Sequence, residues 1–380
     1  MFFNLKNSVS LVFLAFFITC CAQKKEDVLK LYQYQKIPDS LEKSYLVKDY
    51  TLPKEAWYVK IEEVDQKNIA LGTKYLQSIL DKHSKIVLPD AKIMISREGL
   101  KLNSNQEVYF QKNTVLEIEA NSLDKYAVIS VESVKNVRIV NPRIIGDRVG
   151  HLEKTGEHGH GISVLGSENV TIKGFEISNC WGDGLYIGMN AKQKGSENVI
   201  ISNGILDNNR RNGISITNVI GFSSDHVISS NANGAEPMFG LDIEPNWSAN
   251  HNIKDVNIRD FITYNNANGG LMIAIHKMQG DEVKNININI KNYKDYGSYH
   301  GLYFGGIPSG NKNLKGVLEV DNIILSKNTV PIKLRSNQNQ ENFRFSINNF
   351  KVEKPLNKSY STKEINKILS NKKVEFKNIN

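Results

Sequence analysis

The chain has 380 residues and a formal net charge of +8. The basic balance would suit an acidic partner, but the lysines are scattered and no nucleic-acid motif or arginine-rich run accompanies them, so a nucleic-acid-binding protein is excluded. Only three cysteines are present, and two of them are adjacent near the N-terminus, which excludes a fold held by a disulfide framework.

The first twenty residues have the pattern of a secretory signal. Lys6 precedes an apolar run from Val9 to Ile18, which is too short to span a bilayer. A cysteine directly after such a run resembles the lipobox of bacterial lipoproteins, and Cys21 fits that motif better than Cys20. We therefore predict a signal peptide over 1–20, lipidation at Cys21 (or Cys20), and anchoring at the bacterial envelope, in the outer membrane on its periplasmic or cell-surface side.

Residues 21–62 are polar and without a period, which predicts a tether leading into the folded domain. Next, Leu71, Tyr75, Leu76 and Ile79 recur at helical spacing and predict an amphipathic helix. A short strand at 86–88 follows. Such a helix could cover the open end of a repetitive β-structure, whose first coil otherwise exposes apolar core and unpaired strand edges.

A glycine followed by an apolar, variable and apolar residue returns every 23 to 31 residues. A period in this range is typical of a solenoid, in which each repeat forms one coil. Short alternating strands rich in Asn, Gly and Asp lie between the copies, so we predict a parallel β-helix over 63–352, with asparagines stacked at its corners, and a cap or tail over 353–380. The copies are GISV at Gly161, GLYI at Gly184, GISI at Gly213, GLDI at Gly240, GLMI at Gly270, GLYF at Gly301 and the weaker PIKL at Pro331.

The segments NVRIVNPRIIGDR and GHGISVLGSENVTIKGFEISN resemble the right-handed parallel β-helix proteins of the pectate-lyase-like superfamily. The resemblance covers about residues 65–352 and implies an all-β, right-handed solenoid with carbohydrate chemistry. The same scaffold carries hydrolases, lyases, epimerases and non-catalytic modules, so it does not imply one reaction. The polygalacturonase set NTD, DD, GHG and RIK is not found in that order. Gly159-His160-Gly161 precedes the acidic residues, so the role of that family's histidine is not carried over.

Aligning the copies sorts their side chains, because alternate residues of a strand point to opposite faces. The inward positions are predicted to be Ile162, Val164, Leu185, Ile187, Ile214, Ile216, Leu241, Ile243, Leu271, Ile273, Leu302 and Phe304. One outward column is predicted to run Ser163, Tyr186, Ser215, Asp242, Met272, Tyr303 and Lys333, and the next Leu165, Gly188, Thr217, Glu244, Ala274, Gly305 and Arg335.

Asp242 and Glu244 are therefore a carboxylate pair among uncharged neighbours, with Tyr186 and Tyr303 two coils away on either side. Their backbones should lie about 6.6 Å apart, near the lower limit of the carboxylate separation in inverting glycosidases, about 6.5 Å. We predict that they catalyse glycoside hydrolysis of a neutral or acidic polysaccharide, with Asp183 as an auxiliary carboxylate. The predicted substrate contacts are His160, Tyr186, Arg210, Arg211, His276 and Tyr303.

Two other functions stay open at this point. A polysaccharide lyase needs a base and a cation against a uronate carboxylate, for which Arg210, Arg211 and Lys277 are candidates, or Ca²⁺ held by Asp242 and Glu244. A non-catalytic glycan-binding surface lipoprotein could use the same groove. The spacing of His158 and His160 could bind zinc, but no third or fourth ligand can be identified in the sequence. We therefore predict no metal or cofactor, except Ca²⁺ if the protein is a lyase.

Overall fold

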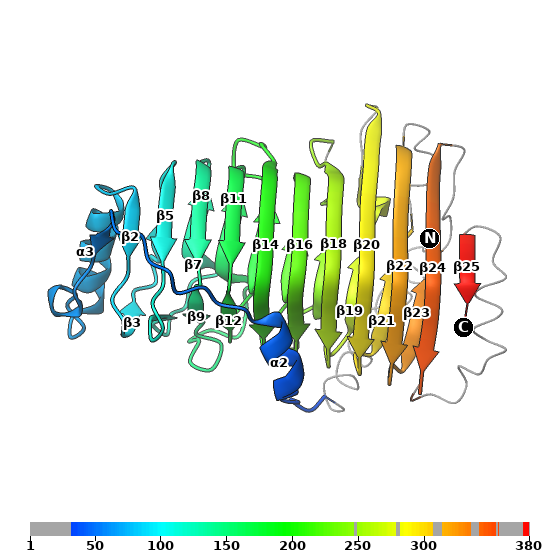
Figure 1. Ribbon diagram of the computed structural model, residues 1–380, viewed down its shortest axis with the longest axis horizontal. Helices are drawn as coiled ribbons and strands as arrows, with labels where there is room; N and C mark the ends of the chain where they lie inside the picture. The colour runs from blue at the N-terminus through cyan, green and yellow to red at the C-terminus, as the bar shows by residue number, and fades with distance from the viewer. Residues whose placement is uncertain are drawn as a thin grey trace, which may run out of the picture.

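The computed structural model describes residues 32–246, 249–278, 282–306, 314–335, 342–354, 356 and 375–379. The predicted signal peptide and Cys20 and Cys21 lie outside these residues. The described chain forms a parallel β-solenoid of about nine turns (Figure 1), as predicted. No helix within the described ranges has both the length and the apolar character needed to cross a membrane.

Two sheets of parallel strands form the walls of the solenoid. The nine-stranded sheet B consists of β4 (Leu100–Lys101), β7 (Lys125–Glu132), β10 (His158–Leu165), β13 (Leu185–Gly188), β15 (Ile214–Ile216), β17 (Phe239–Ile243), β19 (Gly269–Ile273), β21 (His300–Phe304) and β23 (Val330–Leu334).

The 16-stranded sheet A is formed mainly by the longer strands. In the order of pairing these are β1 (Trp57–Tyr58), β2 (Lys85–Val87), β5 (Gln106–Tyr109), β8 (Lys135–Val140), β11 (Glu168–Lys173), β14 (Ser196–Asp207), β16 (Val219–Ser230), β18 (Ile253–Tyr264), β20 (Lys284–Tyr296), β22 (Leu314–Ser326), β24 (Phe343–Glu353) and β25 (Glu375–Ile379). Its short strands are β3 (Lys92–Ile95), β6 (Val115–Ile118), β9 (Arg143–Ile145) and β12 (Glu176–Ser178).

The core is a set of stacked apolar columns, and the repeat predicted its register. Ile162 pairs with Leu185, Leu185 with Ile214, and Ile214 with Leu241. All twelve side chains predicted to point inward are fully buried. Burying such columns contributes about 25 cal/mol per Å² of apolar surface, which makes this stack the main stabilising element of each coil. Cys180 is also buried, as a small residue of the same core.

Asparagines form ladders at the corners of the coils, as predicted. Asn105, Asn136, Asn169 and Asn198 all have φ between +53 and +61. Each side-chain amide of the last three donates to the side-chain oxygen of the asparagine one coil earlier, at 2.8 to 3.1 Å. Asparagine suits this corner because it tolerates the left-handed conformation and still offers both a donor and an acceptor.

The N-terminal end of the solenoid is covered by helix α3 (Ile69–Leu80), the predicted capping helix. Leu76, Ile79 and Leu80 pack into the main core, whereas Leu71 is exposed. Asn68 caps the helix by accepting a hydrogen bond from the backbone N–H of Leu71 at 3.2 Å. The helix thus closes the end at which the first coil would otherwise expose its core.

Part of the predicted tether is ordered against the solenoid. Residues 32–50, here called the strap, contain helix α2 (Asp39–Tyr45) and run across sheet A (Figure 1). Leu41 and Tyr45 pack on an apolar patch of Ile205, Ile228 and Ile262 on the outer side of the coils. The short 3₁₀ helices η1 (Ile61–Glu63) and η2 (Ile275–Lys277) complete the described elements.

Candidate functional site

The outer face of sheet B carries the predicted columns in register. Asp242 pairs with Ser215 on one side and Met272 on the other. The column continues beyond the predicted copies, because Ser163 pairs with Ser130, and Ser130 with Lys101. Sheet B therefore carries one outward column from Lys101 to Lys333, and Asp242 lies near its middle.

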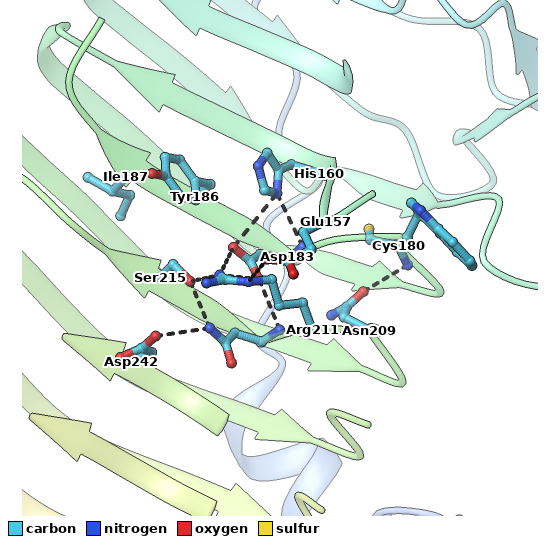
Figure 2. A network of polar contacts seen from close by, with 12 residues as sticks. Glu157, His160, Cys180, Asp183, Tyr186, Ile187, Asn209, Arg211, Ser215 and Asp242 are labelled. Atoms are coloured by element: carbon cyan, nitrogen blue, oxygen red, sulfur yellow. Dashed lines mark hydrogen bonds and ion pairs between the residues drawn. The ribbon is translucent and has the colours of Figure 1, made fainter. Parts of the chain in front are cut away.

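Asp183 is completely buried, and a cation compensates its charge. Nη1 of Arg211 donates to both of its carboxylate oxygens, at 3.2 and 3.0 Å, and the backbone N–H of Asn212 donates to Oδ1 at 2.9 Å (Figure 2). Nδ1 of His160 lies 3.8 Å from Oδ2 and accepts the backbone N–H of Asp183 at 3.2 Å. A buried carboxylate needs such partners to remain ionised.

Asp242 is also buried, at 2% exposure, but no cation contacts it directly within the described residues. Its Oδ2 accepts a hydrogen bond from the side-chain amide of Asn212 at 3.1 Å, while Oδ1 has no hydrogen-bond partner among the residues that the structure describes. Burial and the adjacent Glu244 carboxylate raise the pKa of Asp242 well above its usual range, and Arg211 opposes this shift. Asp242 is therefore the carboxyl group of this face that favours the protonated form.

The acid proton of Asp242 belongs on Oδ1. Asn212 donates to Oδ2, which makes Oδ2 the better carbonyl-type acceptor. Asn212 is itself held in place, because its side-chain oxygen accepts the backbone N–H of Phe239 at 2.8 Å and its amide also donates to Ser215 at 2.9 Å. The surroundings thus favour the protonated form of Asp242 and favour Oδ1 as the oxygen that carries the proton.

Glu244 follows two residues later on the same face and is less buried. Nζ of Lys277 lies 2.8 Å from its Oε1, and the Glu244 side chain is 16% exposed. The two carboxyl groups therefore have different environments, one without a direct cation partner and one in an ion pair. Pairs of titratable groups with such different environments are typical of acid–base sites.

The two flanking tyrosines differ in accessibility. Tyr186 is half-buried, and its ring stacks on His160 with centroids 4.7 Å apart. Tyr303 is 9% exposed and packs against Phe239 and Met272. Only Tyr186 offers a wall of the open groove described below.

The remaining predicted contacts occupy different places. Arg210 turns away to stack on Trp181, with its guanidinium carbon 3.7 Å from the ring centroid, and donates to the carbonyl of Gly156 at 2.7 Å. Arg211 is occupied by Asp183 and by Ser215. His276 lies in η2, beside Lys277, so it is near Glu244. The structure therefore brings His160, Asp183, Arg211 and Asp242 into one network and leaves Arg210 outside it.

An open pocket on this face lies toward the N-terminal cap. A pocket of about 570 Å³ opens over β4, β7, β10 and β13, and it shares His160 and Tyr186 with the network. Its other charged lining residues are Arg97, Lys101 and Lys125 and the carboxylates Glu98 and Glu132. Neither this pocket nor a role for Asn212 was predicted. The first two coils lack the glycine-led repeat, and Asn212, which precedes its glycine as His160 and Asp183 precede theirs, carries no charge that would mark it.

Within the described ranges, the grouping of side chains that could hold a metal ion is Asp225, His226 and Asp260 on sheet A. The guanidinium of Arg259 already donates to both oxygens of Asp225, at 2.9 and 2.8 Å, and lies 3.6 Å from Asp260. A metal ion would have to displace this guanidinium. The negative charge of the cluster is therefore already balanced by Arg259.

Comparison with known proteins supports the fold. A family described as "Right handed beta helix region" matches residues 81–244. Two curated proteins of Bacillus subtilis (strain 168) are similar over part of the chain: the uncharacterized protein YclG, 31% identical over 160 residues, and the SPbeta prophage-derived uncharacterized protein YorA, 30% identical over 162 residues. Each match covers 38% of this chain and only 27 to 28% of the relative.

Several solved structures share the architecture at low identity. An endo-xylogalacturonan hydrolase from Aspergillus tubingensis superposes with a TM-score of 0.55, covering 76% of this chain and 83% of that one. A polygalacturonase from Erwinia carotovora gives 0.50, with coverage of 80% and 88%. The tailspike gp49 of Acinetobacter baumannii bacteriophage Fri1, a capsular polysaccharide depolymerase, gives 0.50, with coverage of 86% and 61%. All three are 12% identical, which establishes the right-handed parallel β-helix and nothing finer.

Proposed function

We propose that this protein cleaves a polysaccharide by hydrolysis on the outer face of sheet B. The observation that carries the proposal is the pair of carboxyl groups with opposite environments: buried Asp242 without a direct cation partner, and Glu244 in an ion pair with Lys277. The fold supports it, because the similar structures include two polysaccharide hydrolases and a depolymerase.

In the proposed reaction, Asp242 gives its Oδ1 proton to the glycosidic oxygen as the bond to the anomeric carbon breaks. Glu244 takes a proton from a water molecule whose oxygen bonds to that carbon from the opposite side, so the configuration inverts. The backbones of the two residues are about 6.6 Å apart along the strand, which leaves room for the water. Proton exchange with solvent then restores both groups.

Elimination is less well supported than hydrolysis. A lyase needs a free cation against the uronate carboxylate, yet Arg211 is bound to Asp183, and Lys277 is bound to Glu244. The same ion pair leaves Glu244 a poor ligand for Ca²⁺, because the ammonium already occupies its oxygen.

A second candidate is glycan binding without cleavage. Asp183 is fully buried and Asp242 is 2% exposed, so a substrate would have to reach Oδ1 past the neighbouring side chains. A purely structural network beneath a binding groove would look the same. Reaction, rather than affinity, separates the two functions.

The test is a panel of neutral and acidic polysaccharides incubated with the full chain. New reducing ends without an unsaturated, ultraviolet-absorbing product indicate hydrolysis, and the absorbing product indicates elimination. Binding without either product favours the binding module. If Asp242→Asn and Glu244→Gln both retain full activity, the assignment of the catalytic pair is overturned.

We further propose that the chain is anchored to the bacterial envelope through a lipid on Cys21 (or Cys20). The sequence of the first twenty residues supports this proposal. Metabolic labelling with a fatty acid should mark the protein in membrane fractions. Cys21→Ala should abolish the label, or Cys20→Ala if that cysteine is the one modified, and labelling that survives both changes would contradict the anchor.

A further inference from the structure

The pocket near the N-terminal cap is not used by the proposed chemistry. It lies over the first coils of sheet B, whereas Asp242 and Glu244 lie on β17 or directly after it. Lys101 and Asp242 occupy the same outward column, five strands apart through Ser130, Ser163, Tyr186 and Ser215. At about 4.8 Å for each strand, the two positions are separated by about 24 Å along the solenoid axis.

Lys101 and Lys125 face this pocket together with Arg97 and two carboxylates, those of Glu98 and Glu132. Glu98 is paired with Arg97, whose Nε lies 3.5 Å from its Oε1. Lys101 and Lys125 are both exposed, and among the described residues neither ammonium group forms an ion pair. Lys101 projects from the same face as Tyr186, since both belong to the outward column, and Lys125 begins the strand that pairs with His158. Apart from the Arg97–Glu98 pair, two ammonium groups on adjacent strands stand against one carboxylate, that of Glu132, so the lining keeps a net positive charge that attracts an anion.

His160 is the third group of this pocket, and it can donate a hydrogen bond from a fixed ring position. Nδ1 of His160 accepts the backbone N–H of Asp183, so in the neutral ring the proton is on Nε2. Burial lowers the pKa of His160 to about 4, despite the opposing effect of Asp183. The ring is thus neutral at ordinary pH, and its remaining nitrogen can only donate a hydrogen bond.

We propose that this pocket is a binding site for a sugar unit carrying an anionic substituent, with Lys101 and Lys125 as its charge partners and His160 as a hydrogen-bond donor. The substituent can be a carboxylate or a sulfate, because both present acceptor oxygens and negative charge. Tyr186 forms the side of the pocket that leads toward Asp242. As a substrate subsite this proposal rests on the proposed function, but the binding itself does not require catalysis.

The experiment measures binding of the full chain to matched glycans by biolayer interferometry. Polygalacturonate and alginate are compared with their methyl esters, which keep the sugars and linkages and remove the charge. Dextran sulfate is compared with dextran to test the sulfate. The variants are Lys101→Ala, Lys125→Ala and the double variant, with Lys291→Ala as the control, because Lys291 is exposed on sheet A and changes the net charge equally.

At least one charged glycan should bind at least tenfold more tightly than its neutral partner, and the preference should weaken as salt is raised. Each single lysine variant should lose about threefold of that affinity and the double variant about tenfold, while Lys291→Ala should bind as the wild type does. A preference for the carboxylated polymers or for dextran sulfate identifies the substituent.

Equal binding of charged and neutral forms, an undiminished preference in the double variant, or no binding to any of these glycans would overturn the proposal. The experiment distinguishes failure of the proposed catalysis from failure of the proposed binding site. Charge-dependent binding without cleavage of any glycan would leave this pocket assigned and reject the catalytic pair. Cleavage of neutral glycans without charge preference would do the reverse.

Discussion

The two halves of the outer face of sheet B belong to the same outward column, but they differ in whether their charged side chains are exposed or buried. Between Lys101 and Tyr186 the face is open, and its charged side chains reach into a pocket. Between Ser215 and Tyr303 every member of the column is buried, including Asp242. The first half can attract a charged ligand, whereas the second changes the protonation of its own groups. One repeat can therefore provide both a binding surface and an acid.

Within the buried part, Asp183 and Asp242 differ in the partners of their carboxyl groups. Asp183 has an arginine directly on its carboxylate, and Asp242 has only an amide from Asn212. Burial penalises the charged form of both, but only Asp183 has a contacting cation that offsets the penalty. The arrangement separates a structural carboxylate from one suited to proton transfer, although they lie only two coils apart.

The largest effect should come from removing the acid. Asp242→Asn keeps the shape and the hydrogen bond from Asn212 but removes the transferable proton, so activity on a cleaved glycan should fall by about 10² to 10⁴-fold. Thermal unfolding should change little, because burial and Glu244 raise the pKa of Asp242 and so already favour its neutral form. Asp225→Asn, on sheet A, is the matched control and should remain active. Equal activity of the two variants would remove Asp242 from the mechanism.

The structural carboxylate gives the next effect. Arg211→Ala leaves Asp183 buried without its cation, which should lower the free energy of unfolding by about 3 to 5 kcal/mol. Chemical denaturation measures this, and adding Asp183→Asn should restore part of the loss. Arg259→Ala, which breaks an exposed pair with Asp225, should barely alter stability. Similar losses in both arginine variants would mean that burial does not distinguish the pairs.

A third prediction extends the comparison to Asp295, which is buried with hydrogen bonds from Thr263, Asn328 and Ser298. Burial raises its pKa from 3.8 to about 7. Because the folded pKa is the higher one, the wild type should lose stability as pH rises from about 4 to about 7, by about 1.4 kcal/mol per pKa unit at most.

Asp295→Asn removes this titration, so its melting temperature relative to the wild type should increase over the same interval. Asp321→Asn, at an asparagine ladder on the surface, serves as the control and should show no such trend. A constant difference between Asp295→Asn and wild type across that pH range would show that Asp295 does not titrate there.

The smallest effect on stability should come from Asn169, at an exposed corner of a coil. Asn169 has φ +55 and stands in the ladder between Asn136 and Asn198. Asn169→Ala should cost about 1 to 2 kcal/mol, from the left-handed conformation and the lost hydrogen bonds. Asn169→Gly should cost less, because glycine adopts that conformation freely. If glycine costs more than alanine, the left-handed conformation is not what makes the alanine variant unstable.

The columns could be predicted from the sequence because a β-helix stacks equivalent residues at one spacing. The repeated motif set the register of the sheet B strands from Gly161 to Pro331, and alternation then assigned inward and outward faces. Asp242 and Glu244 stood out because their neighbours in the copies are uncharged. The helix over Ile69–Leu80 could be predicted for the same kind of reason, a clear apolar period.

Side-chain contacts between distant parts of the chain are not marked by any repeat in the sequence. Arg211 was predicted to contact substrate, but the structure commits it to Asp183, which is 28 residues away in sequence. The pairing depends on the turn that positions Arg211, and no repeat marks that turn. The pocket around Lys101 and Lys125 escaped prediction because its strands lack the glycine that set the phase elsewhere.

The strap along residues 32–50 changes how the solenoid can come apart. A stack of coils is a one-dimensional array in which each repeat contacts only its neighbours, so it can fray from either end. The strap breaks that rule: Asn231 donates to the carbonyl of Gln35, Asn265 to that of Gln33, and Asn141 to that of Asp49. Coils from β9 to β18 are thereby tied to one segment, and they should unfold as a single cooperative block rather than one at a time.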